Sequence, residues 1–199
     1  LIPQLIPDFL NKYPNVKVVI KSNAAQVDLK ADDIDIAFST MLPVSENSYA
    51  ELVKKYSLNL YATPKYIKQF GAPDSLDSFI QNHKYVTGAN ENGTLITQYT
   101  ARNLNTQEET IFPAQSNICS YNAKNSTHFA LTHKYVIFSF DLAVKDLVDK
   151  GELKQVLPDY TFGELSMYLI TKREPLLKVT YPSLMSVITS TVSGMKASI

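Results

Sequence analysis

The first segment of the chain has the hydrophobic spacing of an amphipathic helix. In residues 1–12, LIPQLIPDFLNK, the apolar positions recur at intervals of three and four, at Ile2, Leu5, Ile6, Phe9 and Leu10. This interval places them on one face of a helix. Pro3 is tolerated in the first helical turn, and Pro14 stands where it ends a helix. The pattern therefore predicts a helix over 1–12.

Short apolar segments after this helix have the character of strands. VKVVIKS (16–22) and IDIAF (34–38) are rich in β-branched residues, and YSLNLYA (56–62) alternates apolar with polar positions. Both patterns are typical of strands. The order is thus a helix followed by strands, with short helical or loop segments between them. This order indicates an α/β fold.

The next part of the chain predicts two short helices and four extended segments. The helix PKYIKQF (64–70) begins with Pro64 and ends at Gly71, and the helix LDSFIQNH (76–83) begins after Ser75. The extended segments lie between Gly, Asn and Pro residues. They are KYVTG (84–88), TLITQYTAR (94–102), ETIFP (109–113) and QSNICSY (115–121).

Helices and strands alternate in the last third of the chain. We expect a helix over 122–132 with Asn122 as its cap, and a second over 141–150 that Asp141 caps and Gly151 ends. The remaining expected elements are the strand YVIFS (135–139), a strand and turn in GELKQVLPDY (151–160), the strand ELSMYLITK (164–172) and a closing helix over 181–195.

Composition narrows the class of protein. The 199 residues include 45% hydrophobic and 19% charged residues, and 19 basic residues balance 19 acidic ones. Without a concentrated basic surface this chain is a poor binder of nucleic acid or membrane. The single cysteine, Cys119, excludes an intrachain disulfide and indicates a reducing compartment. No apolar run approaches the eighteen residues of a membrane span, and no signal peptide is visible, so we expect a cytoplasmic protein.

Several segments together resemble one known family. LIPQLIPDFLNKYPNVKVVI (1–20), DDIDIAF (32–38), LYATPKYIKQFGAPDSLDSFIQNH (60–83) and VKDLVDKGELKQVLPDY (144–160) follow one another in the order of its motifs. The chain resembles the effector-binding domain of LysR-type transcriptional regulators over nearly its whole length. It departs from the family at 132–137, THKYVI, where members have a glycine-rich turn. The strand that usually precedes the first helix also lies upstream of Leu1.

The resemblance implies a fold and an organisation. The family's domain is similar to type II periplasmic binding proteins, in which two crossing strands join two Rossmann-like α/β lobes and a small-molecule effector binds in the cleft between them. Carried over, lobe one is 1–62 plus 168–199 and lobe two is 63–167. A winged helix-turn-helix that contacts DNA is expected upstream and is absent from this chain. A homodimer is expected for the domain, and a tetramer is the alternative for the full-length regulator.

The ends of the expected strands nominate the ligand-binding residues. In open α/β sheets, ligands bind beyond the carboxyl ends of the strands. The residues there are neutral and mostly carry hydroxyl or amide groups, which suit hydrogen bonding to a small polar or anionic ligand. The same residue types also form turns and caps. The nominated set is Ser22, Asn23, Ser39, Thr40, Thr87, Gly88, Ser120, Tyr121, Asn122, Phe138 and Ser139.

The acidic segment ADDIDIAFST (31–40) offers a different chemistry. Asp33 and Asp35 are two positions apart, so an extended chain places both carboxylates on one side, within reach of a divalent cation. They also stand at the amino end of the expected strand, away from the ligand edge. We therefore predict that these aspartates form a cap or turn and that Ser39 and Thr40 face the ligand.

Catalytic and cofactor motifs are weak in this sequence. No serine lies in a G-x-S-x-G turn, and His128 and His133 are five positions apart, which does not match a helical metal pair. Cys119 falls in an expected strand and is interpreted as a buried thiol. Gly88 and Gly93 form no phosphate loop. We expect no cofactor and no enzymatic activity.

The resulting prediction is a ligand-sensing domain that controls transcription through dimer geometry. Three alternatives remain open at this point. They are a periplasmic solute receptor of the same fold, a metal-dependent enzyme that uses Asp33 and Asp35, and a sensor whose pocket has decayed. The sequence that precedes Leu1 would distinguish a periplasmic receptor from a regulator. Titration with divalent metals would test the metal-dependent enzyme.

Overall fold

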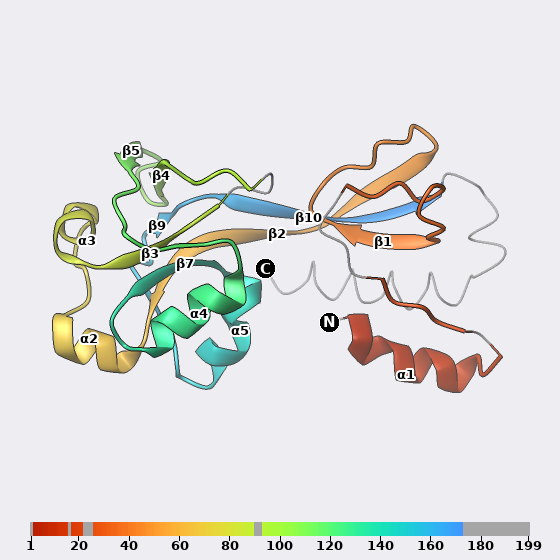
Figure 1. Ribbon diagram of the computed structural model, residues 1–199, viewed down its shortest axis with the longest axis horizontal. Helices are drawn as coiled ribbons and strands as arrows, with labels where there is room; N and C mark the ends of the chain where they lie inside the picture. Colours follow the sequence, from red (N-terminus) through yellow and green to blue (C-terminus); the bar gives the residue numbers. More distant parts are fainter. Residues whose placement is uncertain (1, 16, 22–25, 90–92, 173–199) are drawn as a thin grey trace. The chain divides into compact units, whose positions relative to one another are not determined.

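The computed structural model describes residues 2–15, 17–21, 26–89 and 93–172, and the chain divides into two compact units (Figure 1). One unit comprises Leu1–Lys55 and Ser166–Ile199, and the other is Tyr56–Leu165. The chain passes between the units within two long strands, β2 (Ser48–Ala62) and β10 (Glu164–Lys172). The lobe boundaries expected from the sequence, after residues 62 and 167, stay predictions.

The first unit contains the expected N-terminal helix and a small strand pairing. Helix α1 (Ile2–Lys12) confirms the helical pattern of the first segment. Strand β1 (Ile36–Ser39) pairs antiparallel with β10, which lies between β1 and β2 in the sheet. Val53 of β2 and Leu169 of β10 form a small buried cluster in this unit.

The prediction of a strand over 16–22 is wrong for residues 17–21, the part of this segment that the structure describes. Residues 17–21 have no strand structure, and Val19 and Ile20 are 66% and 59% exposed. β-branched residues supply the propensity for a strand, but a strand forms only where a partner takes its hydrogen bonds and its apolar side chains are buried. Strand β2 is also longer than expected, because residues 48–55 belong to it and their lysines concealed the pattern.

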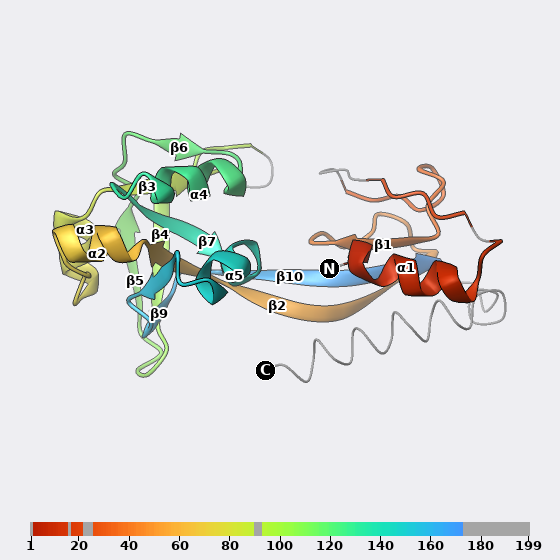
Figure 2. The ribbon, with the colours of Figure 1, turned by 90° about the horizontal axis from the view of Figure 1, so that it is seen from below.

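The second unit contains a sheet with three parallel strand ends. From the outer edge inward the order is β6 (Cys119–Ser120), β3 (Tyr85–Gly88), β7 (Val136–Phe140) and β2, and β8 (Lys154–Val156) also pairs with β2. Strand β3 runs parallel to both of its neighbours, while β7 runs antiparallel to β2. Strand β6 lies at the outer edge, alongside α4 (Figure 2).

Each face of this sheet has its own core. One face buries an aromatic cluster that includes Phe79, Tyr99 and Phe138, and the other buries a cluster around Val86 and Ile137. Figure 1 shows β4 and β5 above the central strands and α4 and α5 below them. The elements that cover the first face are α2 (Pro64–Phe70), α3 (Leu76–Asn82), β4 (Gln98–Asn103), β5 (Glu109–Pro113) and β9 (Tyr160–Thr161). Helices α4 (Ala123–Leu131) and α5 (Asp141–Asp149) cover the second.

The helix boundaries follow the expected caps with one exception. Ser75 and Asn122 cap α3 and α4 by accepting a hydrogen bond from a backbone N–H in the first turn. Gly71 ends α2 with a φ of 80°, a conformation that favours glycine. The predicted cap of α5 is wrong, because Phe140 occupies the cap position and Asp141 is the first helical residue. The closing helix expected over 181–195 lies outside the described residues.

A histidine forms the turn where the family has glycines. His133 has a φ of 62°, and its backbone N–H donates to the carbonyl oxygen of Ala130 at 2.8 Å. Its ring Nδ1 is hydrogen-bonded to Thr63 Oγ1 at 2.9 Å. The expectation that bulkier residues make this turn is confirmed, and the bond to Thr63 compensates for part of the strain of the left-handed conformation.

The second histidine of structural interest, His83, links α2 to α3 and predicts a pH dependence of stability. Its ring Nδ1 is hydrogen-bonded to the Tyr66 hydroxyl at 2.8 Å. Burial lowers the pKa of His83 below its ordinary value of 6.5, although Asp74 acts in the opposite direction. The unfolded chain therefore takes up a proton at a higher pH than the folded protein does.

We expect the free energy of unfolding to fall as the pH drops through about 6.5 toward the lowered pKa of His83. The measurement is urea denaturation between pH 5 and 8, roughly the range over which histidine changes charge. His83→Gln should flatten this part of the profile, whereas His128→Gln, which leaves the Tyr66 contact intact, should not. An unchanged slope in His83→Gln would contradict the assignment.

Candidate functional site

The carboxyl ends of β3 and β7 form a topological switch point within the second unit. The chain leaves β3 toward β4, which covers the aromatic face, and leaves β7 toward α5, which covers the other face. Neighbouring parallel strands whose connections depart to opposite faces leave a crevice at their carboxyl ends. Ligands of open α/β sheets bind at such points, so this edge is the candidate site.

Strand β3 separates from β7 before it separates from β6. The pairing of β3 with β7 ends at Val86 and Ile137, whereas the pairing with β6 continues to Gly88 and Ser120. At the end of β3, the backbone N–H of Gly88 donates to the hydroxyl oxygen of Tyr99 at 3.1 Å. The last peptide group of β3 is thus bound by a side chain from β4.

The structure brings seven of the nominated residues to this edge and places two in the other unit, while the remaining two lie outside the described residues. The seven lie at the ends of β3, β6 and β7 or immediately after them. They are Thr87, Gly88, Ser120, Tyr121, Asn122, Phe138 and Ser139. Ser39 ends β1 in the other unit and Thr40 follows it, and Ser22 and Asn23 lie outside the described residues.

The hydroxyl groups at this edge already contact the backbone. Thr87 Oγ1 donates to the carbonyl oxygen of Ile118 at 3.0 Å, and Ser120 Oγ donates to that of Asn122 at 2.8 Å. Ser139 Oγ makes a long contact of 3.4 Å to the carbonyl oxygen of Phe140. Hydroxyl oxygens keep lone pairs that can accept further hydrogen bonds, so a bound ligand can add to these contacts without breaking them.

Two aromatic side chains stand behind the edge. The rings of Phe138 and Tyr99 are stacked, with 3.9 Å between their centroids and 5° between their planes. Burial raises the pKa of Tyr99 to about 12, so its hydroxyl is protonated at neutral pH. The sequence did not nominate Tyr99, because it lies inside an expected strand and nothing in the local pattern places its hydroxyl beside Gly88.

A hollow of about 490 Å³ lies between β6 and α4. Ser120 and Tyr121, both nominated from the sequence, line it together with Cys119. The residues that the nomination missed come from one face of α4, at the helical spacing i, i+3, i+4 and i+7. They are Asn125, His128, Phe129 and Thr132. That spacing is visible in the sequence, but strand ends give no indication of which face of a helix lines a hollow.

The cysteine is less buried than expected. Cys119 is half-buried rather than enclosed, and its Sγ donates a hydrogen bond to the carbonyl oxygen of Gly88 at 3.2 Å. Both backbone groups of Gly88 are therefore held by side chains, the N–H by Tyr99 and the carbonyl by Cys119. This fixes the end of β3 from two sides.

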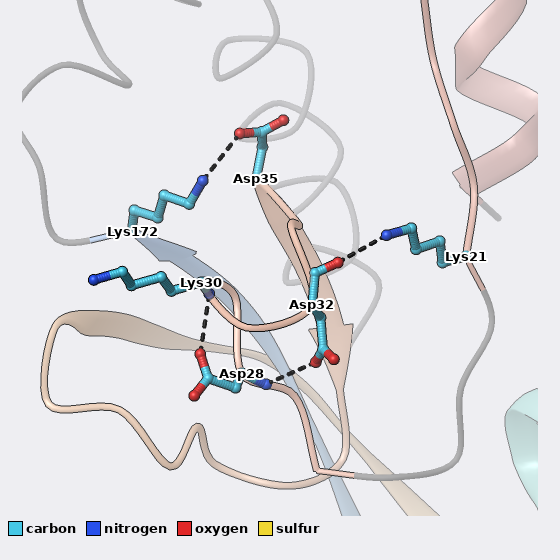
Figure 3. Close-up of polar contacts among 6 residues, drawn as sticks. All are labelled: Lys21, Asp28, Lys30, Asp32, Asp35 and Lys172. Carbon is cyan, nitrogen blue, oxygen red and sulfur yellow. Dashed lines mark hydrogen bonds and ion pairs between the residues drawn. The ribbon is translucent and has the colours of Figure 1, made fainter.

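The prediction of a cap or turn is confirmed for Asp33, which lies in a turn over residues 29–33 with a φ of 52°, whereas Asp35 lies beyond this turn, next to β1 (Figure 3). Asp28 Oδ1 accepts from the backbone N–H groups of Lys30 and Ala31 at 3.0 and 3.1 Å, and Asp32 Oδ2 accepts from that of Asp28 at 3.1 Å. Asp35 contacts Lys172 at 3.3 Å in an exposed ion pair, a kind of contact that adds little stability.

The described part of the chain has neither a helix suited to a membrane nor a cluster of metal-ligating side chains. In residues 2–15, 17–21, 26–89 and 93–172, no helix is long and apolar enough to cross a membrane. Across the same ranges, no group of three or more His, Cys, Asp or Glu side chains is placed to hold a metal ion.

Comparisons with known proteins agree on one family and one fold. The model of the LysR substrate binding domain matches residues 1–189. The HTH-type transcriptional activator TtdR of Escherichia coli K12 is 24% identical over 173 residues, which are 87% of this chain and 54% of that protein. An uncharacterized HTH-type transcriptional regulator of Haemophilus influenzae is 20% identical over 181 residues, which are 90% of this chain and 61% of that protein.

Solved structures are similar in fold. The regulatory domain of AphB from Vibrio vulnificus has a TM-score of 0.70 at 18% identity, covering 96% of this chain and 92% of that one. The regulatory domain of CrgA from Neisseria meningitidis, a LysR-type transcriptional regulator, has a TM-score of 0.70 at 17% identity. The match covers 94% of this chain and 91% of that one. The expected architecture, α/β and similar to type II periplasmic binding proteins, is confirmed. These matched relatives are transcriptional regulators and not enzymes.

Proposed function

Because this chain belongs to the LysR substrate-binding domain family, we propose that it is the effector-sensing part of a LysR-type transcriptional regulator. It binds a small molecule, and binding changes how the regulator acts on DNA. The chain spans about half the length of the curated relatives it matches, so contact with DNA is assigned to a part of the protein beyond this chain. The zero net charge of the chain agrees with that division of labour.

One observation carries the ligand-binding proposal. Three parallel strand ends with neutral, hydrogen-bonding residues converge at a switch point of the sheet, where open α/β folds bind ligands. Thr87 and Ser139, both buried and polar, lie at this convergence. Ser39 and Thr40 of the other unit stay part of the proposed site, and the expectation that the ligand lies between the two lobes stays a prediction.

A thermal-shift screen of metabolites tests ligand binding. A ligand that binds only the folded protein raises its Tm by mass action, and about 100 times its Kd adds roughly 2.7 kcal/mol of stability. Thr87→Val and Thr40→Val keep the side-chain shape and remove a hydroxyl, so each should reduce the shift for the active compound. Thr127→Val is the matched control, because Thr127 is half-exposed and its hydroxyl bonds within its own helix, to the carbonyl oxygen of Ala123. A screen without any active compound, or threonine variants that respond like the wild type, would refute the site.

Control of transcription through dimer geometry forms the second half of the proposal. A ligand shifts an equilibrium between two arrangements only by its difference in affinity for them. We therefore expect a homodimer of the regulator whose small-angle scattering profile and operator affinity both change when the active compound is added. A compound that binds tightly and changes neither would separate ligand binding from regulation. A cytoplasmic location also stays a prediction.

A further inference from the structure

We propose that the Tyr99 hydroxyl is a ligand-binding group and donates its proton to a carbonyl or carboxylate oxygen of the ligand. The inference rests on the proposed function and deepens it, because it names a binding residue and a chemical class for the same site. It arises from the position of Tyr99 and from the hydrogen bond that its oxygen already accepts.

The bond from Gly88 gives the Tyr99 hydroxyl a direction. A phenol offers one donor and an oxygen that accepts, and here the backbone N–H of Gly88 occupies the acceptor at 3.1 Å. Among the described residues no hydrogen bond from the phenol proton to an acceptor is found. The group that remains for a ligand is therefore a donor.

The ring of Tyr99 holds this donor in place. Tyr99 is 4% exposed, and its ring is stacked against Phe138 at 3.9 Å and against Phe112 at 5.9 Å between centroids. A buried ring in a stacked cluster has little freedom to turn. A donor that is fixed before binding loses little entropy when the ligand arrives, and this favours affinity and selectivity.

The absence of a side chain at Gly88 leaves room beside the hydroxyl. A Cβ at this position would lie 3.9 Å from the Tyr99 oxygen and 3.4 Å from Ile96 Cδ1. Both separations are ordinary van der Waals contacts, so a methyl group fits the fold but occupies space next to the donor. Gly88 also ends the strand at the switch point, where the proposed ligand approaches.

The surrounding residues limit the ligand's charge. The seven nominated residues at this edge are all uncharged, so no fixed cation among them compensates a multiply charged anion. A neutral carbonyl or a single carboxylate satisfies a phenol donor without that cost. A ligand whose polar groups are all N–H donors leaves the phenol proton unpaired and binds more weakly for that reason.

Tyr85 provides a matched control for Tyr99. It belongs to the same aromatic cluster, is 3% exposed, and its hydroxyl also accepts a backbone hydrogen bond, from Gln115 at 2.8 Å. Tyr85 lies at the amino end of β3, away from the strand ends that form the site. Phenylalanine at either position removes one buried hydroxyl and one bond to the backbone, so the structural cost is similar.

The experiment is a thermal-shift titration of the purified wild-type chain, Tyr99→Phe, Tyr85→Phe and Gly88→Ala. The probes are acetate, pyruvate, succinate, 2-oxoglutarate, benzoate and acetone as oxygen acceptors, with putrescine and cyclohexylamine as donors that lack oxygen, followed by a wider metabolite library. We expect an oxygen-containing compound to bind the wild type and Tyr85→Phe equally. Its affinity for Tyr99→Phe should fall about tenfold or more, the effect of one lost hydrogen bond to a polar ligand. Gly88→Ala should fold normally and bind the same compound more weakly.

The outcomes separate the inference from the proposed function. A compound that binds all four proteins with equal affinity overturns the role of Tyr99 and leaves ligand binding intact. If only the oxygen-free amines bind, the role of Tyr99 is likewise overturned and ligand binding is retained. If nothing in the panel or the wider library binds the wild type, the proposed function and this inference both fail.

A mutation-free measurement covers the case in which Tyr99→Phe does not fold. When the phenol donates to a ligand, its oxygen becomes a better acceptor for Gly88, because linked hydrogen bonds polarise one another. The backbone amide resonance of Gly88 in isotope-labelled wild type should therefore move downfield on binding. An amide that stays in place while the compound binds overturns the inference.

Discussion

Phe79→Ala is expected to lower the free energy of unfolding by about 3–5 kcal/mol, the usual cost of replacing a buried phenylalanine by alanine. Phe79 of α3 is fully buried, and its ring meets the rings of Tyr85, Phe138 and Phe162 at 5.0, 5.9 and 6.4 Å between centroids. The truncation removes apolar area and leaves a cavity whose rigid aromatic walls cannot close around it.

The measurement for Phe79→Ala is chemical denaturation at equilibrium, followed by circular dichroism. Phe70→Ala is the matched control, because Phe70 ends the neighbouring helix α2 and is 50% exposed. We expect this control to lose about 1 kcal/mol or less. Comparable losses in the two variants would show that the aromatic cluster is not the main source of stability in this unit.

The aromatic cluster also connects stability with ligand binding. Phe138 packs against Phe79 on one side and stacks on Tyr99, whose hydroxyl lies at the end of β3. A change in the packing of the cluster moves the ring that carries the proposed donor. We therefore infer that substitutions deep in the cluster affect ligand affinity even where they do not touch the ligand.

Local sequence signals were sufficient for most elements of the second unit. Asn122 before an apolar helical pattern marked the start of α4, and Gly71 marked the end of α2. Strand β10, which passes between the units, also has the bounds that its sequence pattern predicts. In these cases the residue that sets the boundary acts through its own side chain or its own φ angle, so its effect can be read without knowing the tertiary structure.

Features that depend on distant partners could not be predicted. The segment 17–21 has the composition of a strand but no strand structure, because composition does not supply a pairing partner. The contact between Gly88 and Tyr99 joins residues on two strands of different sheets. The strand-end rule found Gly88 from its position, but only the folded arrangement brings the Tyr99 hydroxyl to it.

The turn at His133 depends both on a local sequence signal and on a residue that is distant in the sequence. The sequence shows that 132–137 lacks the glycines of the family, and it follows that a bulkier residue must make the turn. It does not show which residue adopts the positive φ or what stabilises it. The structure assigns that conformation to His133 and shows that Thr63, far away in the sequence, holds the ring.

Thr63→Val is accordingly expected to lower the free energy of unfolding by about 2–4 kcal/mol. Thr63 is 1% exposed, and its hydroxyl accepts from the backbone N–H of Tyr66 at 3.1 Å while it bonds His133 Nδ1 at 2.9 Å. Valine has the same shape but leaves both partners without a hydrogen bond, at about 1–3 kcal/mol for the buried Tyr66 N–H and about 1 kcal/mol for the half-buried His133 ring. Ser75→Ala removes the equivalent cap of α3, where water can replace the lost bond, and should cost about 1 kcal/mol. Both variants are to be compared by equilibrium denaturation, and equal losses of stability would mean that the bond between Thr63 and His133 does not stabilise the turn before β7.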